Sequence, residues 1–413
     1  MAEKQVFQSN SSRRWRVFQW STRLFLFGLL MTIPVVWIAL SRSYKPMLPL
    51  LTNDEFTYKK RNKPDSARAF SAKENKKYKG FKNFMDAKNA LKNSSNLPKA
   101  QSIRAGFYVN WDAQSLFSLE SNIDKMNMVI PEWLSIDPKT DTLAVNIDND
   151  ALTVMREHKV AILPILNNIN ETKGGDFDPK LLSRVLKNPA KSRRLIDDLL
   201  KILKQYNFKG INIDFEAIDD KSTALALENF QMEVYKRLHT EGYLVTQDVM
   251  ASDENFHNKK LALYKDYIFL RAYDQHWTTS VAEPVCEQRW IEKMLDENAA
   301  EIPENKIVLC IAGYGYDWAE GEVGVTVTYQ EALATAAEMN ATIDFDNDTY
   351  NCKYTYKDGR GKSHEVQFCD AATNFNTMHF ADEYGVAGVA LWRLGSEDHR
   401  LWSFTTEIYR ANL

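Results

Sequence analysis

Residues 208–218 read Phe-Lys-Gly-Ile-Asn-Ile-Asp-Phe-Glu-Ala-Ile and predict a short buried β-strand. Three apolar side chains alternate with three polar ones, and successive side chains of a strand point to opposite faces. The apolar residues are Ile211, Ile213 and Phe215, and the polar ones are Asn212, Asp214 and Glu216. Such a strand suits the wall of a closed barrel, with an outer helix on its apolar face and its acids rising inside to the rim. The alternative is an ordinary edge strand whose polar face is solvated.

The body of the chain, which begins at Ile103, continues this pattern. Apolar runs recur with helical patterns between them, which is the alternation of a parallel α/β barrel. Eight runs are candidate strands: Arg104–Asn110, Met126–Glu132, Val160–Leu166, Gly210–Glu216, Leu244–Met250, Tyr267–Asp274, Ile307–Tyr314 and Val386–Trp392. The clearest amphipathic helices are Ser192–Tyr206 and Thr223–Thr240. The predicted fold class is therefore α/β, a (β/α)8 TIM barrel over residues 101–413.

This domain is longer than the ~250 residues of a bare barrel. We expect a small α+β insertion between the seventh and eighth strands, at about residues 326–370, with a helix at Tyr329–Met339 and a hairpin at 358–362. Folding the hairpin about the bond between residues 360 and 361 places Cys352 opposite Cys369, which predicts a disulfide in an oxidising compartment. Two unpaired cysteines are the alternative.

No zinc-type spacing is present among the cysteines, which are Cys286, Cys310, Cys352 and Cys369. The histidines also show no ligand spacing. We therefore expect no metal and no cofactor.

Residues 24–40 contain no charged side chain and predict a transmembrane signal anchor. The run is at the short end for a spanning helix, which needs roughly 17 to 25 residues. The basic residues beside it are Arg13, Arg14, Arg16 and Arg23 before the run, and Arg42 and Lys45 after it. This imbalance predicts that residues 1–23 stay in the cytoplasm and that the body is periplasmic or extracellular. A cleaved signal peptide is the alternative, although the run exceeds the roughly 7–15 residues of a signal core.

Charge is distributed unevenly along the 413 residues, whose formal net charge is −3. Residues 1–44 carry +5, residues 45–100 carry +9, and the remainder carries −17. Residues 41–100 are rich in Lys, Asn and Ser with little periodicity, which predicts a basic, flexible linker. The acidic body argues against nucleic acid as a partner. It favours cationic, partly deacetylated amino-sugar polymers over fully acetylated ones.

Residues 209–216 also resemble the Asp-x-x-Asp-x-Asp-x-Glu motif of glycoside hydrolase family 18, the chitinase-like enzymes. The resemblance places Glu216 on the proton donor and Asp214 on the carboxylate that orients the substrate acetamide. Lys209 and Asn212 replace the first and second Asp of the motif. Asn at the second position also occurs in the spore-cortex-lytic branch of the family, so Asn212 remains a candidate substrate-binding residue.

Three further strand ends match the family in barrel order. Arg271-Ala-Tyr273-Asp274 resembles its Met-x-Tyr-Asp motif, which implies that Tyr273 stabilises an oxazolinium intermediate and makes Asp274 a candidate contact. Trp392 matches the tryptophan that floors the sugar subsite. Residues 313–318 are similar to a Tyr-Gly-Tyr-Asp-Trp segment of the spore-cortex branch and include Tyr314. The candidate groove residues on the first two strands are Tyr108, Asn110, Trp111, Glu132 and Trp133.

The chemistry of the two acids agrees with this resemblance. Cleaving a glycosidic bond requires a carboxylic acid that stays protonated near neutrality. Asp214 and Glu216 lie close on one strand face, and like charges raise one of the two pKa values. In family 18 the nucleophile is the substrate's own acetamide. We therefore expect hydrolysis of a β-1,4-linked N-acetylglucosamine polysaccharide, chitin-like or peptidoglycan-like, by substrate-assisted retention.

Arg271 favours a different function. It shares the inward parity of Tyr273, where the family has methionine, and a buried guanidinium must be paired. The nearest candidate partners are Asp214 and Asp248. If Arg271 locks Asp214, the chain would be a non-catalytic saccharide-binding barrel that assists extracellular polysaccharide synthesis or remodelling.

The anchored barrel also resembles the amino-terminal part of bacterial fusion proteins. These proteins join such a domain to a polysaccharide deacetylase and a family 2 glycosyltransferase. This sequence contains neither partner. The resemblance therefore predicts that a deacetylase and a glycosyltransferase act beside it as separately encoded proteins.

Overall fold

The computed structural model describes residues 20–23, 102–250 and 258–404. The apolar run at 24–40 and the linker at 41–100 lie outside these ranges, so the anchor and the linker stay predictions. Within the ranges described, no helix is long and apolar enough to cross a membrane.

Eight parallel strands, two of them interrupted, form the barrel in the described part of the chain. They are β1 (Ile103–Tyr108), β2 (Met128–Pro131) with β3 (Leu134–Ile136), β5 (Ala161–Ile162) with β6 (Ile165–Asn167), β9 (Gly210–Asp214), β10 (Leu244–Met250), β11 (Tyr267–Arg271), β12 (Ile307–Ala312) and β18 (Gly388–Trp392). The ring closes because β5 pairs with β2, whereas β6 pairs with β3 and β9. Every predicted strand overlaps one of these strands, and the α/β barrel architecture is confirmed.

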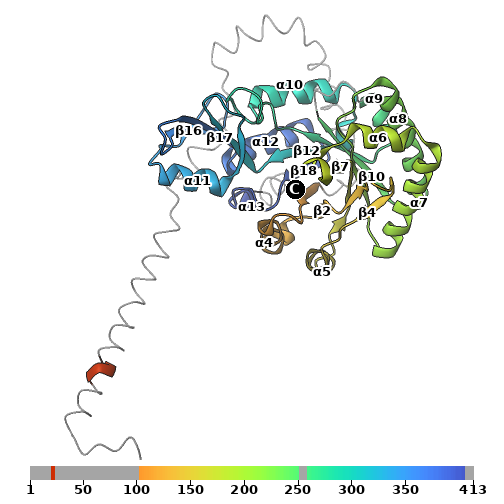
Figure 1. Ribbon diagram of the computed structural model, residues 1–413, viewed down its shortest axis with the longest axis horizontal. Helices are drawn as coiled ribbons and strands as arrows, with labels where there is room; N and C mark the ends of the chain where they lie inside the picture. The colour runs from red at the N-terminus through yellow and green to blue at the C-terminus, as the bar shows by residue number, and fades with distance from the viewer. Residues whose placement is uncertain (1–19, 24–101, 251–257, 405–413) are drawn as a thin grey trace, which may run out of the picture. The chain divides into compact units, whose positions relative to one another are not determined.

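Helices follow the strands and lie outside the sheet (Figure 1). They are α4 (Ala113–Asn122), α5 (Asn149–Glu157), α6 (Pro179–Leu186), α7 (Pro189–Tyr206), α8 (Lys221–His239), α9 (Asn258–Leu261), α10 (Gln288–Ala299), α12 (Ala371–Tyr384) and α13 (Leu401–Phe404). The two helices predicted most clearly correspond to α7 and α8. The short strand β4 (Leu143–Val145) pairs antiparallel with β3, whereas β7 (Ile169–Asn170) and β8 (Asp176–Phe177) form a separate two-stranded sheet.

Strand β9 has the two-faced character that its sequence predicts. Ile211 and Ile213 are fully buried, and the Phe215 ring lies 5.7 Å from that of Phe230 in α8. The apolar face therefore packs outward on a helix, and Asn212 and Asp214 face inward. Because β9 pairs with β6 on one side and β10 on the other, it is not an edge strand.

The insertion between β12 and β18 forms a separate antiparallel sheet in the order β14-β13-β17-β16-β15. Its elements are β13 (Tyr314–Ala319), β14 (Val325–Thr328), α11 (Tyr329–Glu338), β15 (Asp344–Phe345), β16 (Cys352–Lys357) and β17 (Ser363–Phe368). The predicted position and α+β character are right, but the insertion begins near residue 314 and not 326. Only Gly313 separates β12 from β13, so the sequence does not mark where the chain leaves the barrel.

The predicted disulfide between Cys352 and Cys369 is wrong by one residue of register. The hairpin pairs Cys352 with Phe368, and a one-residue slip sends a side chain to the other face of the sheet. All four cysteines are free thiols in the structure. The Cys369 sulfur instead lies 3.2 Å from that of Cys286, which follows strand β11.

Gly210 is required where β9 meets β10. A Cβ atom at this position would lie 2.1 Å from the backbone oxygen of Leu244, whereas one at Gly359 would meet nothing within 4 Å. We expect Gly210→Ala to lower the free energy of unfolding by about 1–3 kcal/mol, since the strands must separate to admit the methyl group. Gly359→Ala is the control, and urea denaturation measures both. Equal stability of the two variants would contradict this packing.

Candidate active site

A pocket of about 830 Å³ opens at the carboxyl ends of the barrel strands. Nine of the twelve predicted site residues line it: Asn110, Trp111, Glu132, Trp133, Asp214, Glu216, Tyr273, Asp274 and Trp392. The other three lie behind its wall: Tyr108, Asn212 and Tyr314. Side chains as far apart in sequence as Asn110 and Trp392 lie together in this pocket because their strands all end at the same rim of the barrel.

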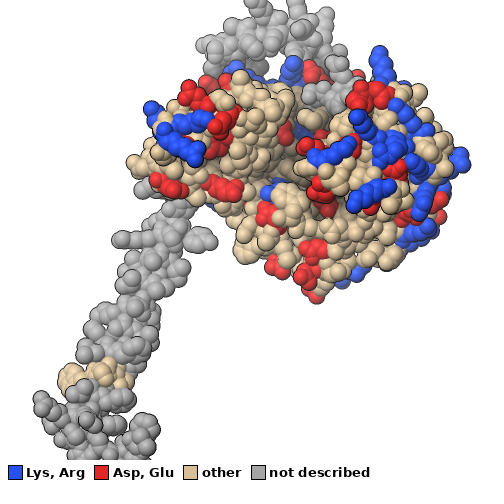
Figure 2. Space-filling model, in the orientation of Figure 1, with Lys and Arg blue, Asp and Glu red and all other residues tan. Residues whose placement is uncertain are grey.

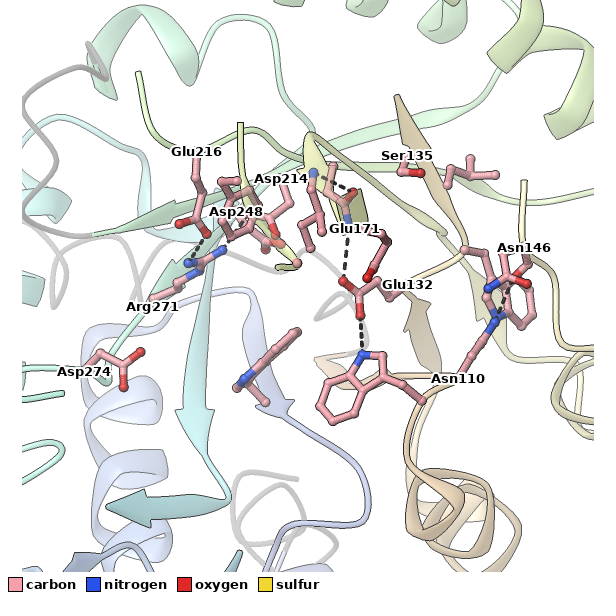
Figure 3. Close-up of a pocket in the computed structure, with 18 of the residues that line it drawn as sticks. Asn110, Glu132, Ser135, Asn146, Glu171, Asp214, Glu216, Asp248, Arg271 and Asp274 are labelled. Carbon is pink, nitrogen blue, oxygen red and sulfur yellow. Dashed lines mark hydrogen bonds and ion pairs between the residues drawn. The ribbon is translucent and has the colours of Figure 1, made fainter. Parts of the chain in front are cut away.

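Arg271 contacts both acids of the β9 motif. Its Nη2 donates a hydrogen bond of 2.6 Å to Asp214 Oδ1, and its Nη1 lies 2.5 Å from Glu216 Oε1. Figure 3 shows the guanidinium pointing toward these two carboxylates. The predicted pairing of Arg271 with Asp214 is confirmed, and Glu216 is a second partner. One cation therefore bridges the two acids that the family motif makes catalytic.

Burial and charge act against each other in this group. Burial raises the pKa of Asp214 well above its ordinary value, and the Arg271 guanidinium opposes that shift. Burial alone would lower the pKa of Arg271, but Asp214 and Glu216 beside it hold that pKa above its usual range. The guanidinium is therefore charged at every physiological pH, and at Asp214 its effect only partly offsets that of burial.

The backbone of Glu216 is fixed by Asn168. The Glu216 amide donates to Asn168 Oδ1 at 3.0 Å, and Asn168 Nδ2 donates to the Glu216 carbonyl at 3.0 Å. Ala217, the next residue, has a left-handed φ of 58°, which redirects the chain immediately after the acid. Both backbone polar groups of Glu216 are thus satisfied while its side chain reaches into the pocket.

Asp248, on β10, lies in the pocket wall beside Asp214. Asn212 donates a hydrogen bond of 2.7 Å to Asp248 Oδ2, and Thr246 donates one of 2.6 Å to Asn212 Oδ1. Asn212 therefore supports a lining residue and is itself fully buried. Burial raises the pKa of Asp248 to about 7, against the opposing effect of Arg271.

The insertion contributes to the site through Asp274. Tyr316 donates a hydrogen bond of 2.7 Å to Asp274 Oδ1, and Tyr314 donates to the same oxygen. Burial raises the pKa of Asp274, and these two hydroxyls oppose the shift. Tyr273 lies edge-on to Tyr314, with 6.0 Å between ring centroids. Strand β13 therefore supports two lining residues of the barrel.

A tryptophan and an acid form the opposite wall. Trp111 is 65% exposed, and its Nε1 donates to Glu132 Oε2 at 2.9 Å. Asn167 donates to the other Glu132 oxygen at 3.1 Å, and burial raises the pKa of Glu132. The guanidinium of Arg393 lies 4.2 Å from the Trp111 ring centroid. Trp111 thus presents a fixed aromatic surface on which a sugar ring can stack.

The remaining predicted residues have structural contacts. Trp133 is almost completely buried, and its Nε1 donates to Asn110 Oδ1 at 2.8 Å. Tyr108 donates a hydrogen bond of 2.5 Å to Asp148. Trp392, on β18, packs edge-on against Phe107 with 5.2 Å between ring centroids. Trp133 and Trp392 both line the pocket, but Trp133 is only 1% exposed, whereas Trp392 is partly exposed.

Residues 103–398 match the family model described as "Glycosyl hydrolases family 18". The chain belongs to this family.

Relatives in the family agree with the predicted branch. The uncharacterized glycosylase YvbX of Bacillus subtilis is 27% identical over 315 residues, which cover 74% of this chain and 90% of that protein. The cortical fragment-lytic enzyme of Bacillus subtilis is 23% identical over 63% of this chain and 62% of its own length. These matches confirm the predicted likeness to the spore-cortex-lytic branch of family 18.

Solved structures share the fold. The spore cortex-lytic enzyme SleL of Bacillus megaterium has a TM-score of 0.66 at 22% identity, over 75% of this chain and 76% of that one. A mutant of the class V chitinase of Nicotiana tobaccum, in complex with NAG4, has a TM-score of 0.64 at 18% identity, over 75% of this chain and 98% of that one. The family 18 barrel predicted from the sequence is therefore the observed fold.

The lining or supporting residues that were not predicted site residues include Asn167, Asn168 and Asp248, of which Asp248 was predicted only as a possible partner of Arg271. Asn167 and Asn168 follow the third strand directly, so the rule that functional groups gather at strand ends could have found them. Asp248 has the inward parity of Thr246 on a predicted strand. Among residues 102–250 and 258–404, no cluster of His, Cys, Asp and Glu is suited to hold a metal ion.

Asp248 should make the stability of the protein depend on pH. Its pKa is about 7 when folded and about 3.9 when unfolded, so the folded state binds the extra proton between these values. The stability from this proton is complete below about pH 4 and is lost as pH rises through 7. We expect Asp248→Asn to gain on the order of 2–4 kcal/mol relative to wild type between about pH 4 and pH 8, in urea denaturation.

The exposed Asp344→Asn variant controls for net charge in that experiment. Parallel stability profiles for wild type and Asp248→Asn would contradict the assignment.

Proposed function

We propose that this chain is a membrane-anchored glycoside hydrolase that cleaves β-1,4-linked polysaccharide containing N-acetylglucosamine. The observation that carries the proposal is the meeting of Glu216, Asp214, Tyr273 and Trp392 in one pocket at the barrel rim. The family 18 fold and the relatives named as glycosylases and cortex-lytic enzymes support glycoside hydrolysis. The NAG4 bound by the tobacco chitinase supports an amino-sugar ligand.

Each residue has a distinct role in the proposed reaction. Glu216, 26% exposed in its side chain, donates a proton to the glycosidic oxygen as the bond breaks. The acetamide oxygen of the same sugar attacks the anomeric carbon from the opposite side, so no protein nucleophile is required. Asp214, deeper and only 7% exposed, holds the acetamide, and Tyr273 hydrogen-bonds it. Trp392 supports the sugar ring by stacking.

Arg271 sets a condition on this reaction. Its Nη1 lies 2.5 Å from Glu216 Oε1, so the guanidinium occupies an oxygen of the carboxyl group that would donate the proton. The Glu216 side chain must therefore leave the guanidinium before each cleavage. Substrate that fills the pocket and presents its glycosidic oxygen would compete with Arg271 for this carboxyl group.

The proposed location is the outer side of a cell membrane. The uncharged run at 24–40 and the arginines before it support an anchor with a cytoplasmic amino terminus. The body would then meet its polymer in the periplasm or outside the cell. A polysaccharide deacetylase and a glycosyltransferase are the proposed partner enzymes, on the resemblance to fused proteins.

The proton donor is tested by Glu216→Gln, which keeps the size of the side chain and removes the acid. We expect release of products from chito-oligosaccharides to fall at least 100-fold, because general acid catalysis contributes about 10²–10⁴. Asp344→Asn, an exposed acid of the insertion, should retain wild-type turnover. Wild-type turnover no faster than that of Glu216→Gln would remove the proposal.

A second candidate function is supported by the Arg271 contacts themselves. A guanidinium that bridges Asp214 and Glu216 engages both acids, and a site whose acids stay engaged in this way binds saccharide without cleaving it. The chain would then be a non-catalytic barrel that presents or senses polymer.

Arg271→Met separates the two functions. For a hydrolase, we expect the wild type to cleave chito-oligosaccharides and Arg271→Met to lower kcat/KM about tenfold or more, because the buried Asp214 loses the cation that pairs with it. Arg271→Lys keeps the charge and should lower kcat/KM less. Binding without cleavage by the wild type, together with cleavage gained in Arg271→Met, would establish the binding barrel instead.

A further inference from the structure

The two carboxyl oxygens of Asp248 differ in their hydrogen bonding. Oδ2 accepts the hydrogen bond from Asn212, whereas Oδ1 is buried without a hydrogen-bond partner among the described residues. The residue is only 5% exposed, and it lines the pocket. A buried carboxylate oxygen without a donor is costly, which agrees with the raised pKa of Asp248, about 7. Once Asp248 has lost that proton, a free Oδ1 at a pocket wall indicates a place where a ligand donates.

The pocket is strongly acidic. Its lining holds six carboxyl groups: Glu132, Glu171, Asp214, Glu216, Asp248 and Asp274. Arg271 is the only basic side chain among the lining residues that the structure describes, and it is engaged by Asp214 and Glu216. Figure 2 shows acidic side chains beside the hollow near the centre of the face, whereas basic ones gather over α6 and α7. Among these described lining residues, no protein cation remains for Asp248.

The position of Asp248 is fixed by strand register. Asn212 lies opposite Thr246 in the β9–β10 pairing, so Asp214 and Asp248, each two residues further on, are inward-facing neighbours. The hydrogen bonds from Thr246 to Asn212 and from Asn212 to Asp248 orient the carboxyl group. Oδ1 is thus held in place beside the acid that would hold the substrate acetamide.

We propose that Asp248 Oδ1 binds the ammonium group of a glucosamine unit, which makes partly N-deacetylated chains the substrate class of this pocket. This assignment rests on the proposed function, in which the pocket holds an amino-sugar polymer. An ammonium offers both the donor and the positive charge that a buried carboxylate lacks, whereas an acetamide offers only a neutral N–H. A partly acetylated chain also retains the acetamide that the cleavage step requires.

Binding to the Glu216→Gln protein tests the assignment without turnover. Calorimetry would measure the affinities of the glucosamine hexamer and of the N-acetylglucosamine hexamer for two proteins. One is Glu216→Gln, and the other carries both Glu216→Gln and Asp248→Asn. We expect the second substitution to weaken glucosamine hexamer binding about tenfold or more, since hydrogen bonds to charged groups are the stronger ones. Binding of the acetylated hexamer should change less than about threefold, because its neutral N–H gains less from the carboxylate, and Asp344→Asn should alter neither affinity.

Three results would overturn the assignment. Unchanged glucosamine binding would show that Asp248 takes no part, and equal losses for both hexamers would show that it acts only on pocket structure. Asp248→Ser, a smaller neutral residue, gives the same comparison if the Asn variant does not fold. Failure of the Glu216→Gln protein to bind either hexamer would instead remove the proposed function itself, and the assignment with it.

Discussion

The ion pairs of Arg271 are the interaction on which this site depends. Asp214 is buried, Glu216 is three-quarters buried, and a pair of unpaired carboxylates in such surroundings would either bind protons or destabilise the fold. One guanidinium at 2.6 and 2.5 Å from the two acids relieves that cost. The same contact occupies the carboxyl group that a general acid must present to its substrate. The resting site is therefore held by ion pairs, and substrate must displace Arg271 from Glu216 for catalysis.

Much of the barrel could be predicted because its signals are local. Alternation in β9 fixed which side chains face inward, and the same parity argument on β11 paired Arg271 with Asp214. The contact with Glu216 could not be predicted in that way. Glu216 lies two residues beyond the end of β9, where strand alternation no longer determines direction. Asn168, which sets that direction, belongs to a loop distant in sequence.

Register and sheet membership were harder to predict than strands. The hairpin was recognised, but its pairing differs by one residue, which is sufficient to separate Cys352 from Cys369 and leave Cys286 as the neighbour of Cys369. Likewise, β13 continues the apolar run of β12, although it pairs with β14 and β17 of the insertion. Strand register and sheet membership depend on contacts between segments that are distant in sequence, and these contacts cannot be inferred from a single sequence.

The two hydrogen bonds between the Asn168 side chain and the Glu216 backbone determine which part of Glu216 can move. Because the peptide groups on both sides of the acid are bonded to one amide side chain, the main chain at this point is immobilised. The carboxyl group can exchange partners only through rotation about its own single bonds, which takes place on the picosecond to nanosecond scale for side chains with room to move. Switching between the resting and working arrangements thus takes place in the side chain of Glu216, while its backbone stays bonded to Asn168.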